Sequence, residues 1–368
     1  MNKGANTGIW VIATGVIIAL LYLGRNILAP FALAVFLYLV IEGFARAIDN
    51  SSVTLKRAPS RVIAILTVVG GFVGFIALMA RGIAQFGRDA GDYERKINQL
   101  ISDAFSVARI DDAPQLTELL FSEQGQSFFA TIGRATGDLS GDLVIILIYV
   151  AFLFAAQSSW TQKLDNIFPR SKDRDQARVV GDDARRGIET YLWTQTVISA
   201  LITVLSYASL LLLGVDNALF LSAMIFVLNY IPTVGSIVAA LVPPLFALVQ
   251  PGVPEWVPGA APQDTYIYSA IVFAVISFWQ FSIGNFIQPR LMGESLNLSS
   301  LIVLLSLAIW GIIWGIPGMF LSAPLTVLMM ILFAQSDSTR WIAILLSADG
   351  DPQGKGKNIA VQHDQEAS

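Results

Sequence analysis

The sequence contains no cysteine and a single histidine, His363, among its 368 residues. The lack of cysteine excludes disulfide scaffolds, thiol catalysis and cysteine-ligated metal sites. One histidine in a polar tail cannot build a histidine-based triad or a zinc site, which needs several nitrogen or sulfur ligands. We therefore expect no catalytic residues, no metal and no other cofactor, and we predict that the chain is not an enzyme.

Charged residues are also scarce, at 14% of the chain, against about a quarter in an ordinary soluble domain. The net charge is -4, and basic residues occur only in short runs, so we expect no nucleic-acid partner. Hydrophobic residues make up 55% and the mean hydropathy is +0.64. More than half of the residues lie in eight stretches without any charge: Gly4–Gly24, Asn26–Ile41, Val62–Ala80, Leu143–Gln162, Thr190–Val215, Asn217–Pro254, Thr265–Pro289 and Ser295–Ser336.

These stretches have the length and apolar character of membrane-spanning helices, which need about 20 mostly apolar residues. A helix on the surface of a soluble protein would show a polar face instead. The fold class predicted is therefore an all-α polytopic membrane protein, with the lipid bilayer as its first partner. The first stretch is too long for a typical signal peptide, and we expect a multi-pass protein of a bacterial inner membrane.

About six full spans are predicted, and the chain divides accordingly. The first two spans are short and separated only by Gly24-Arg25-Asn26, which predicts a tight hairpin. The spans lie near Trp10–Leu23, Ile27–Ile41, Val62–Ala80, Leu143–Trp160, Tyr191–Leu213 and Tyr266–Ile287. The predicted parts are N-terminal transmembrane helices (1–80), an extramembrane amphipathic helical insert (81–142), a transmembrane helix with a cytoplasmic charged linker (143–189), a transport core with two helical hairpins (190–336) and a polar cytoplasmic tail (337–368).

The insert carries a heptad-like apolar stripe, which predicts one amphipathic helix. Asp112-Ala113-Pro114 predicts the start of a further short helix. A helical hairpin that folds back on itself or lies on the membrane explains such a stripe, and so does contact between subunits. The stripe consists of Ile83, Phe86, Ala90, Tyr93, Ile97, Leu100 and Ala104.

Orientation follows from counting basic residues near membrane ends, which favour the cytoplasm. Four of them lie between Glu42 and Arg61 and seven between Lys163 and Glu189, so both loops are predicted to be cytoplasmic. The acidic insert is then outside, and both chain termini are inside.

Two of the apolar stretches are too long for one crossing and are interrupted at their centres. Asn217–Val249 is broken at Ile231-Pro232-Thr233-Val234-Gly235, and Ser295–Ser336 at Gly315-Ile316-Pro317-Gly318. Each predicts a helical hairpin whose tip turns inside the bilayer, where free backbone groups must be buried in protein or face water. Each hairpin follows one span, in opposite orientations, which is the outline of an inverted repeat with broken helices. Ordinary Pro and Gly usage in transmembrane helices is the competing explanation.

The motifs of the C-terminal half resemble one family of bacterial transporters. They are Asn229–Gly235, Pro243-Pro244, Asn285–Gly293, Trp310-Gly311, Gly315–Met319 and Pro324-Leu325, and they are similar to those of the autoinducer-2 exporter (PerM-like permease) family. The resemblance implies efflux of small molecules, notably the quorum-sensing signal autoinducer-2, whereas some members are assigned to sodium or lithium/proton antiport. It also suggests a homo-oligomer. Ser236 and Ser300 stand where the family often has proline.

Polar residues inside the apolar stretches are the candidates for binding a solute. Thr196, Ser199, Thr203 and Ser206 are spaced to share one helix face, and interhelical packing is the alternative role for such hydroxyls. Buried carboxamides are costly unless they have partners, which singles out Asn229, Gln280 and Asn285. The predicted substrate-binding residues are Thr196, Ser199, Asn229, Ser236, Gln280, Asn285 and Gln288, and the predicted hinge or hairpin-tip residues are Pro232, Gly235, Gly315, Pro317 and Gly318.

None of the eight stretches contains an ionisable residue of the kind from which proton relays are built. Glu42, Glu189, Asp216 and Glu294 stand at the edges of spans, where solvated or capping roles are expected. A neutral, hydroxyl-rich solute fits this lining better than an ion. We therefore predict a permease that exports a small polar solute by alternating access. A monovalent cation/proton antiporter, with a cation or proton as coupling partner, and a membrane scaffold or interaction protein are the alternatives.

Overall fold

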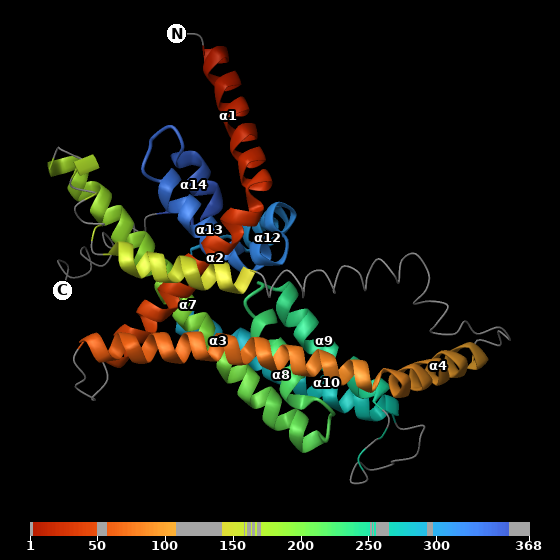
Figure 1. The fold of residues 1–368 in the computed structure, drawn as a ribbon. Helices are drawn as coiled ribbons and strands as arrows, with labels where there is room; N and C mark the ends of the chain where they lie inside the picture. Colours follow the sequence, from red (N-terminus) through yellow and green to blue (C-terminus); the bar gives the residue numbers. More distant parts are fainter. Residues whose placement is uncertain are drawn as a thin grey trace, which may run out of the picture. The chain divides into compact units, whose positions relative to one another are not determined.

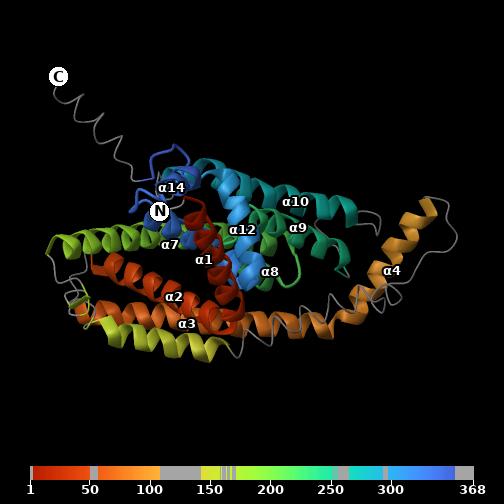
Figure 2. The ribbon, with the colours of Figure 1, turned by 90° about the horizontal axis from the view of Figure 1, so that it is seen from above.

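A computed structural model describes residues 3–49, 57–107, 142–157, 171–250, 265–292 and 297–352, with a few single positions between these ranges. The described residues are almost entirely helical (Figures 1 and 2). In chain order the elements are α1 (Lys3–Leu23), α2 (Arg25–Asp49), α3 (Arg57–Arg88), α4 (Ala90–Val107), the helix Asp142–Gln157, α7 (Ser171–Leu213), α8 (Ala218–Leu228), α9 (Val234–Val249), α10 (Thr265–Ser282), the π-helix η2 (Ile283–Ile287), α11 (Gln288–Met292), α12 (Ser300–Trp314), α13 (Ile316–Phe333) and α14 (Arg340–Leu346).

The surface of these helices is apolar to an extent that suits lipid rather than water. Leu23, Leu212 and Ile312 are each more than three-quarters exposed, and a soluble protein rarely exposes large contiguous apolar surface. Five described segments are long and apolar enough to cross a bilayer: Arg25–Asp49, Ser60–Gln85, Arg178–Leu213, Thr265–Leu291 and Ile316–Phe333. These findings confirm the predicted all-α polytopic membrane protein.

The chain forms two compact units. Unit 1 comprises residues 1–64, 145–195 and 291–368, and unit 2 comprises residues 65–144 and 196–290. Both α3 and α7 contribute residues to each unit, so their N-terminal and C-terminal parts are described separately below.

The core of unit 1 is built where α2 meets the second helical hairpin, α12–α13. Ala29 of α2 packs with Trp310 and Leu321 of the hairpin, and the indole Nε1 of Trp314 donates a hydrogen bond to the carbonyl oxygen of Leu21 at 3.1 Å. A second cluster joins Leu39 to the first half of α7 and to α13. The apolar arms of this hairpin are thus fixed by packing against other helices.

The core of unit 2 is built where the first helical hairpin, α8–α9, packs against α10 (Figure 2). Pro243 and Pro244 lie inside α9 and cannot donate backbone hydrogen bonds. The carbonyl oxygen of Pro244 accepts a hydrogen bond from the hydroxyl of Ser269 of α10 at 2.8 Å. Beyond the end of α9, the buried Gln250 donates to the carbonyl oxygen of Gly252 and accepts from the backbone N–H of Asp216. These bonds fix the end of the hairpin to the chain segment that precedes it.

Three local expectations are corrected by the structure. Helical hydrogen bonds run through Gly24, from Gly24 to Leu20 and from Leu28 to Gly24, so α1 and α2 are joined by a bend and the predicted tight hairpin is wrong. The stripe of the insert runs over two consecutive helices, because α3 ends at Arg88 and α4 begins at Ala90, and hydrogen bonds from Asp89 to Gln85 and from Tyr93 to Asp89 join them at a bend. The charged linker before span five is helical from Ser171 onward and forms one 43-residue helix with that span. The short helix predicted near Asp112 lies outside the described residues.

Candidate functional site

All seven predicted substrate-binding residues belong to unit 2. They come from three places: the second half of α7, the tip of the first hairpin, and the region of α10 to α11. Two side-chain hydrogen bonds connect these places. Thr196 of α7 and Tyr230 of the tip share a hydroxyl–hydroxyl bond of 2.7 Å, and Gln280 of α10 donates from Nε2 to Asn229 Oδ1 at 3.3 Å. The structure therefore brings Thr196, Asn229 and Gln280 to one hairpin tip.

The hydroxyl face of α7, consisting of Thr196, Ser199, Thr203 and Ser206, contains buried groups with unused bonding capacity. Ser199 and Ser206 are 0% exposed. Among the described residues, the hydroxyls of Ser199, Thr203 and Ser206 have no hydrogen-bond partner, and neither does that of Ser277 on α10. Buried polar groups are normally satisfied, so these hydroxyls are suited to an occupant that can hydrogen bond.

Other buried hydroxyls of the chain behave differently and provide a comparison. Ser222 donates to the carbonyl oxygen of Ala218 at 2.7 Å, and Thr326 donates to that of Ser322 at 2.7 Å. Such bonds to the preceding turn are the usual solution for Ser and Thr inside a helix. The hydroxyl face of α7 does not use this solution.

Three other predicted substrate-binding residues do not take part in the two hydrogen bonds that join the hairpin tip to α7 and α10. Asn285 is exposed, and its Nδ2 donates to the carbonyl oxygen of Phe281 in its own helix at 2.9 Å. Gln288 is half-buried at the start of α11, and Ser236 donates to the carbonyl oxygen of Thr233. Ser236 and Asn285 thus bond backbone carbonyls of their own segments, whereas Asn229 and Gln280 bond each other.

The helix that carries Gln280 changes its geometry just beyond it. Residues Ile283–Ile287 form a π-helix. Pro289, four residues after Asn285, explains this change, because proline lacks the N–H and its ring clashes with the carbonyl four residues earlier. Single π turns inside α-helices occur frequently at functional sites.

One glycine in each hairpin stands where no other residue fits. A Cβ on Gly235 would lie 1.7 Å from the carbonyl oxygen of Leu228, and a Cβ on Gly318 would lie 1.9 Å from that of Trp310. Gly315 has open space at its Cβ position, and its φ of 68° is the reason that glycine suits it. The first tip also holds Thr233 at a φ of 61°, which is strained for a β-branched residue.

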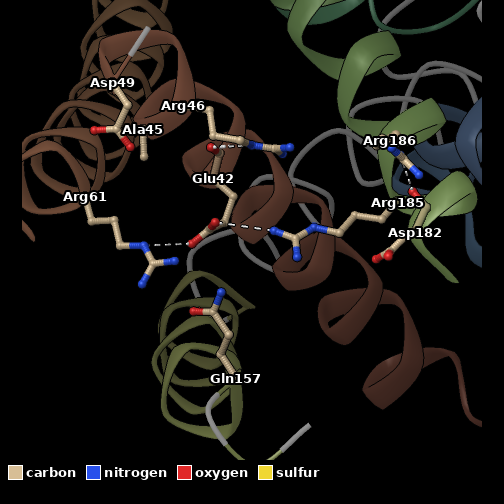
Figure 3. A pocket seen from close by; sticks show the side chains of 9 residues that line it. All are labelled: Glu42, Ala45, Arg46, Asp49, Arg61, Gln157, Asp182, Arg185 and Arg186. Carbon is tan, nitrogen blue, oxygen red and sulfur yellow. Dashed lines mark hydrogen bonds and ion pairs between the residues drawn. The ribbon is translucent and has the colours of Figure 1, made fainter. Parts of the chain in front are cut away.

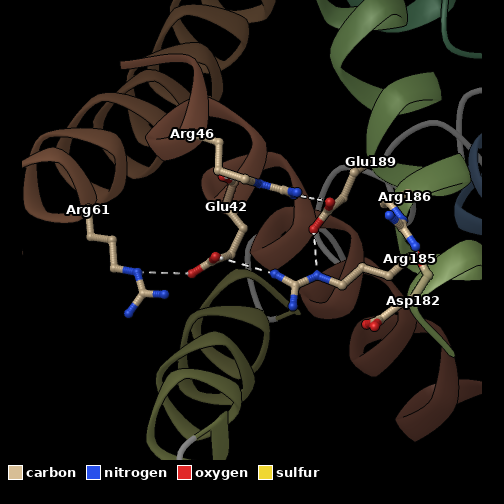
Figure 4. Close-up of polar contacts among 7 residues, drawn as sticks. All are labelled: Glu42, Arg46, Arg61, Asp182, Arg185, Arg186 and Glu189. Atoms are coloured by element: carbon tan, nitrogen blue, oxygen red, sulfur yellow. Dashed lines mark hydrogen bonds and ion pairs between the residues drawn. The ribbon is translucent and has the colours of Figure 1, made fainter. Parts of the chain in front are cut away.

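A charged cluster in unit 1 was missed by the sequence reasoning. Glu42 and Glu189 are only 4% and 5% exposed, so the expectation that they are solvated at the ends of spans is wrong. Glu42 pairs with Arg61 and Arg185, and Glu189 pairs with Arg46 and Arg185 (Figure 4). The spacing of four residues between Arg185 and Glu189 was a signal, since helical neighbours at this spacing face each other.

This cluster forms one wall of a cavity of about 350 Å³. The arginines are partly accessible, with 45% of the Arg46 side chain and 41% of the Arg61 side chain exposed. The cavity is lined by Glu42, Ala45, Arg46, Asp49, Arg61, Gln157, Asp182, Arg185 and Arg186 (Figure 3). In the described part of the chain, no group of three or more metal-ligating side chains is close enough to hold a metal ion.

Apolar helices long enough to span a bilayer, broken hairpins and buried polar side chains together define a polytopic membrane protein of the transporter class. Residues 11–337 match the family described as AI-2E family transporter, and the chain belongs to this family.

Three named relatives are similar to this chain over most of their length. The AI-2 transport protein TqsA of Escherichia coli is 26% identical over 88% of this chain and 90% of that protein. A "Putative transport protein" of Haemophilus influenzae is 27% identical over 91% of this chain and 94% of its own. The "Putative permease PerM" of Escherichia coli is 24% identical over 84% and 87%. These similarities establish a membrane transport role for the family and confirm the resemblance read from the motifs.

Proposed function

We propose that this protein is a permease that exports a small polar solute, of the autoinducer-2 type, by alternating access. The observation that carries the proposal lies on the hydroxyl face of α7, where the hydroxyls of Ser199, Thr203 and Ser206 have no hydrogen-bond partner among the described residues. A hydroxylated solute can supply the missing hydrogen bonds, and Thr196 of the same face already bonds Tyr230 of the hairpin tip. The name of the relative TqsA supports autoinducer-2 as the first solute to test.

The two broken hairpins support alternating access, because transporters with inverted repeats place their binding sites at such breaks. The first tip provides Asn229 and Tyr230 as polar contacts. Pro232, Gly235, Gly315, Pro317 and Gly318 act as hinges in this proposal. The transport core of residues 190–336 then works together with the N-terminal helices.

The test is autoinducer-2 transport into inverted membrane vesicles containing the full chain. Replacing Ser199 by Ala should weaken the apparent affinity, since losing one hydrogen bond costs about 0.5 to 1.5 kcal/mol, or roughly twofold to tenfold. Ser222→Ala is the matched control, because Ser222 is equally buried but bonded to its own helix. Equal transport by both variants, or none by the unaltered chain, would refute the proposal.

The buried carboxylates Glu42 and Glu189 favour a second function, monovalent cation/proton antiport. Ionisable groups in membrane proteins often mark ion pathways. Sodium or lithium efflux driven by an imposed pH gradient would establish this function, and autoinducer-2 flux that ignores the gradient would oppose it. A scaffold role, the remaining alternative, predicts no flux of either kind.

We also propose a bacterial inner-membrane location with both termini in the cytoplasm, and assembly as a homo-oligomer. Tyr93 of the stripe is 3% exposed and packs against Phe246 of α9, so it is used within the chain. Ile83 is 44% exposed and remains available for a contact between subunits. Ile83→Glu should dissociate the assembly in native mass spectrometry, whereas unchanged stoichiometry would remove Ile83 from the interface.

A further inference from the structure

The cavity of unit 1 holds guanidinium groups that are only loosely engaged. Arg61 Nε and Arg185 Nη2 each lie 3.3 Å from a carboxylate oxygen of Glu42. Arg185 Nε, in contrast, lies 2.7 Å from Glu189. Charge-assisted hydrogen bonds normally measure about 2.7 to 2.9 Å, so Glu189 holds its arginine tightly and Glu42 does not.

Several donors around this cavity are still available. Arginine carries five N–H donors, and Arg61 uses only Nε in its ion pair among the described residues. In Figure 3 the guanidinium groups of Arg61 and Arg185 and the amide of Gln157 surround one space next to Glu42. Asp49, Asp182 and Arg186 line the same cavity.

The hydrogen-bond donors around the space, rather than its net charge, favour an anion. The charged residues that line the cavity are Glu42, Arg46, Asp49, Arg61, Asp182, Arg185 and Arg186, and the neighbouring Glu189 balances the remaining positive charge. Planar guanidinium forks match phosphate geometry and bind it through paired hydrogen bonds. A phosphate that enters the space can take over the long contacts of both arginines to Glu42.

We propose that this cavity is a binding site for a phosphate group, presented either by the headgroup of an anionic lipid or by a soluble phosphate compound. Its position suits a lipid. Glu42 is the first charged residue after the apolar run Asn26–Ile41, and Arg61 is the last one before the apolar run Val62–Ala80. The two side chains therefore lie at the depth where lipid phosphates are found, and basic pockets at the ends of transmembrane helices bind such headgroups.

The site can be tested on the purified full chain with two probes. Native mass spectrometry after incubation with phosphatidylglycerol, compared with diacylglycerol, which has no phosphate, measures lipid retention. Thermal unfolding in inorganic phosphate, compared with chloride at equal ionic strength, measures a soluble anion. Retention of phosphatidylglycerol assigns the site to lipid, and stabilisation by phosphate alone assigns it to a soluble compound.

Arg61→Gln should weaken binding of whichever probe binds by roughly tenfold or more, since it removes a charged donor. Arg95→Gln is the matched control, because Arg95 is an exposed arginine of α4 far outside this cavity in sequence. Gln157→Leu leaves every ion pair in place and should weaken binding severalfold, so it keeps the test decisive if Arg61→Gln does not fold. Binding of neither probe, or equal binding by Gln157→Leu and the unaltered chain, would overturn the proposal.

Discussion

The two helical hairpins have the same construction but different surroundings. In each, a glycine of the second arm passes so close to a carbonyl of the first arm that a Cβ has no room. The first tip is a turn of several residues, and its Asn229 and Tyr230 bond polar groups of α10 and α7. The second tip turns at a single residue, Gly315, with a φ of 68°.

The surroundings of the second hairpin are apolar. Trp310 and Trp314 lie with ring centroids 5.1 Å apart and pack with Ala29 of α2. Its buried Ser306 and Ser322 donate to carbonyls of their own helix. Both hairpins thus share the close glycine–carbonyl contact but differ in their surroundings. The first hairpin offers polar groups to neighbouring helices, and the second is fixed in an apolar core.

The largest expected effect is a difference in cysteine labelling that reports on which side of the membrane the chain lies after each hairpin. The chain contains no cysteine, so single cysteines can be labelled without background. If the hairpins return the chain to opposite sides, Gln263→Cys should react with an impermeant thiol reagent on intact cells, as should Ser122→Cys. Ser338→Cys and Ser171→Cys should react only after permeabilisation. Labelling of Ser338→Cys on intact cells would contradict the prediction that the two hairpins have opposite orientations in the membrane.

A large loss of stability is expected when a Cβ atom is introduced at the glycine that contacts the opposite arm of either hairpin. Gly235→Ala and Gly318→Ala place a Cβ 1.7 and 1.9 Å from a carbonyl oxygen, and such overpacking costs about 3 kcal/mol. Gly74→Ala, in open space within α3, is the control. Thermal unfolding in detergent measures the difference. Should Gly235→Ala unfold at the temperature of Gly74→Ala, the close approach is not a constraint on the hairpin.

A moderate effect separates the polar tip from the apolar one. Asn229→Ala and Gln280→Ala should raise the apparent KM for the transported solute severalfold, because each removes a hydrogen bond worth about 0.5 to 1.5 kcal/mol. Ser306→Ala and Ser322→Ala, in the second hairpin, should leave the KM unchanged. Initial rates in vesicles give these values. An altered KM in the second pair alone would move the site to the other hairpin.

The smallest effect is a pH dependence at the base of the first hairpin. Partial burial and the negative charge of Asp89 raise the pKa of Asp216 above its ordinary value. The folded chain therefore binds this proton more tightly than the unfolded chain, so the contribution of Asp216 to stability falls as the pH rises from the ordinary aspartate value through the raised one. The change is small because the side chain is accessible to solvent, which screens its interactions.

Asp216→Asn should accordingly unfold at a slightly higher temperature than the unaltered chain at pH 7, and the difference should disappear at acid pH. Asp337→Asn, at an exposed carboxylate after the second hairpin, is the control. A difference that grows on acidification would have the wrong sign.

Composition alone predicted the fold class, because stretches without charge can be read directly from the sequence. The hairpin breaks were also visible, since Pro232 and Gly315 interrupt long apolar runs. The sequence predicted Asn229 and Gln280 as candidate residues because both are polar, but it did not predict the hydrogen bond between them. That bond depends on the packing of α10 against the hairpin tip.

The cluster at Glu42 was not anticipated, because its partners are distant in the chain. Arg185 lies 143 residues from Glu42, and no local pattern in a single sequence indicates such a pair. At Gly24, in contrast, a local pattern was present but suggested the wrong structure. Three polar or small residues in a row suggested a turn, whereas one helical hydrogen bond on each side of Gly24 was enough to continue the helix.

The part of α7 that belongs to unit 2 fixes the rotational positions of its hydroxyl groups around the helix axis. Thr196, Ser199, Thr203 and Ser206 are separated by three and four residues and therefore lie on one face, over about 15 Å of helix. An insertion of one residue between Ser199 and Thr203 would turn the last two hydroxyls by about 100° relative to the first two, whereas an insertion of seven residues would nearly preserve the face. Length changes in this part of α7 are therefore expected to be tolerated in whole heptads.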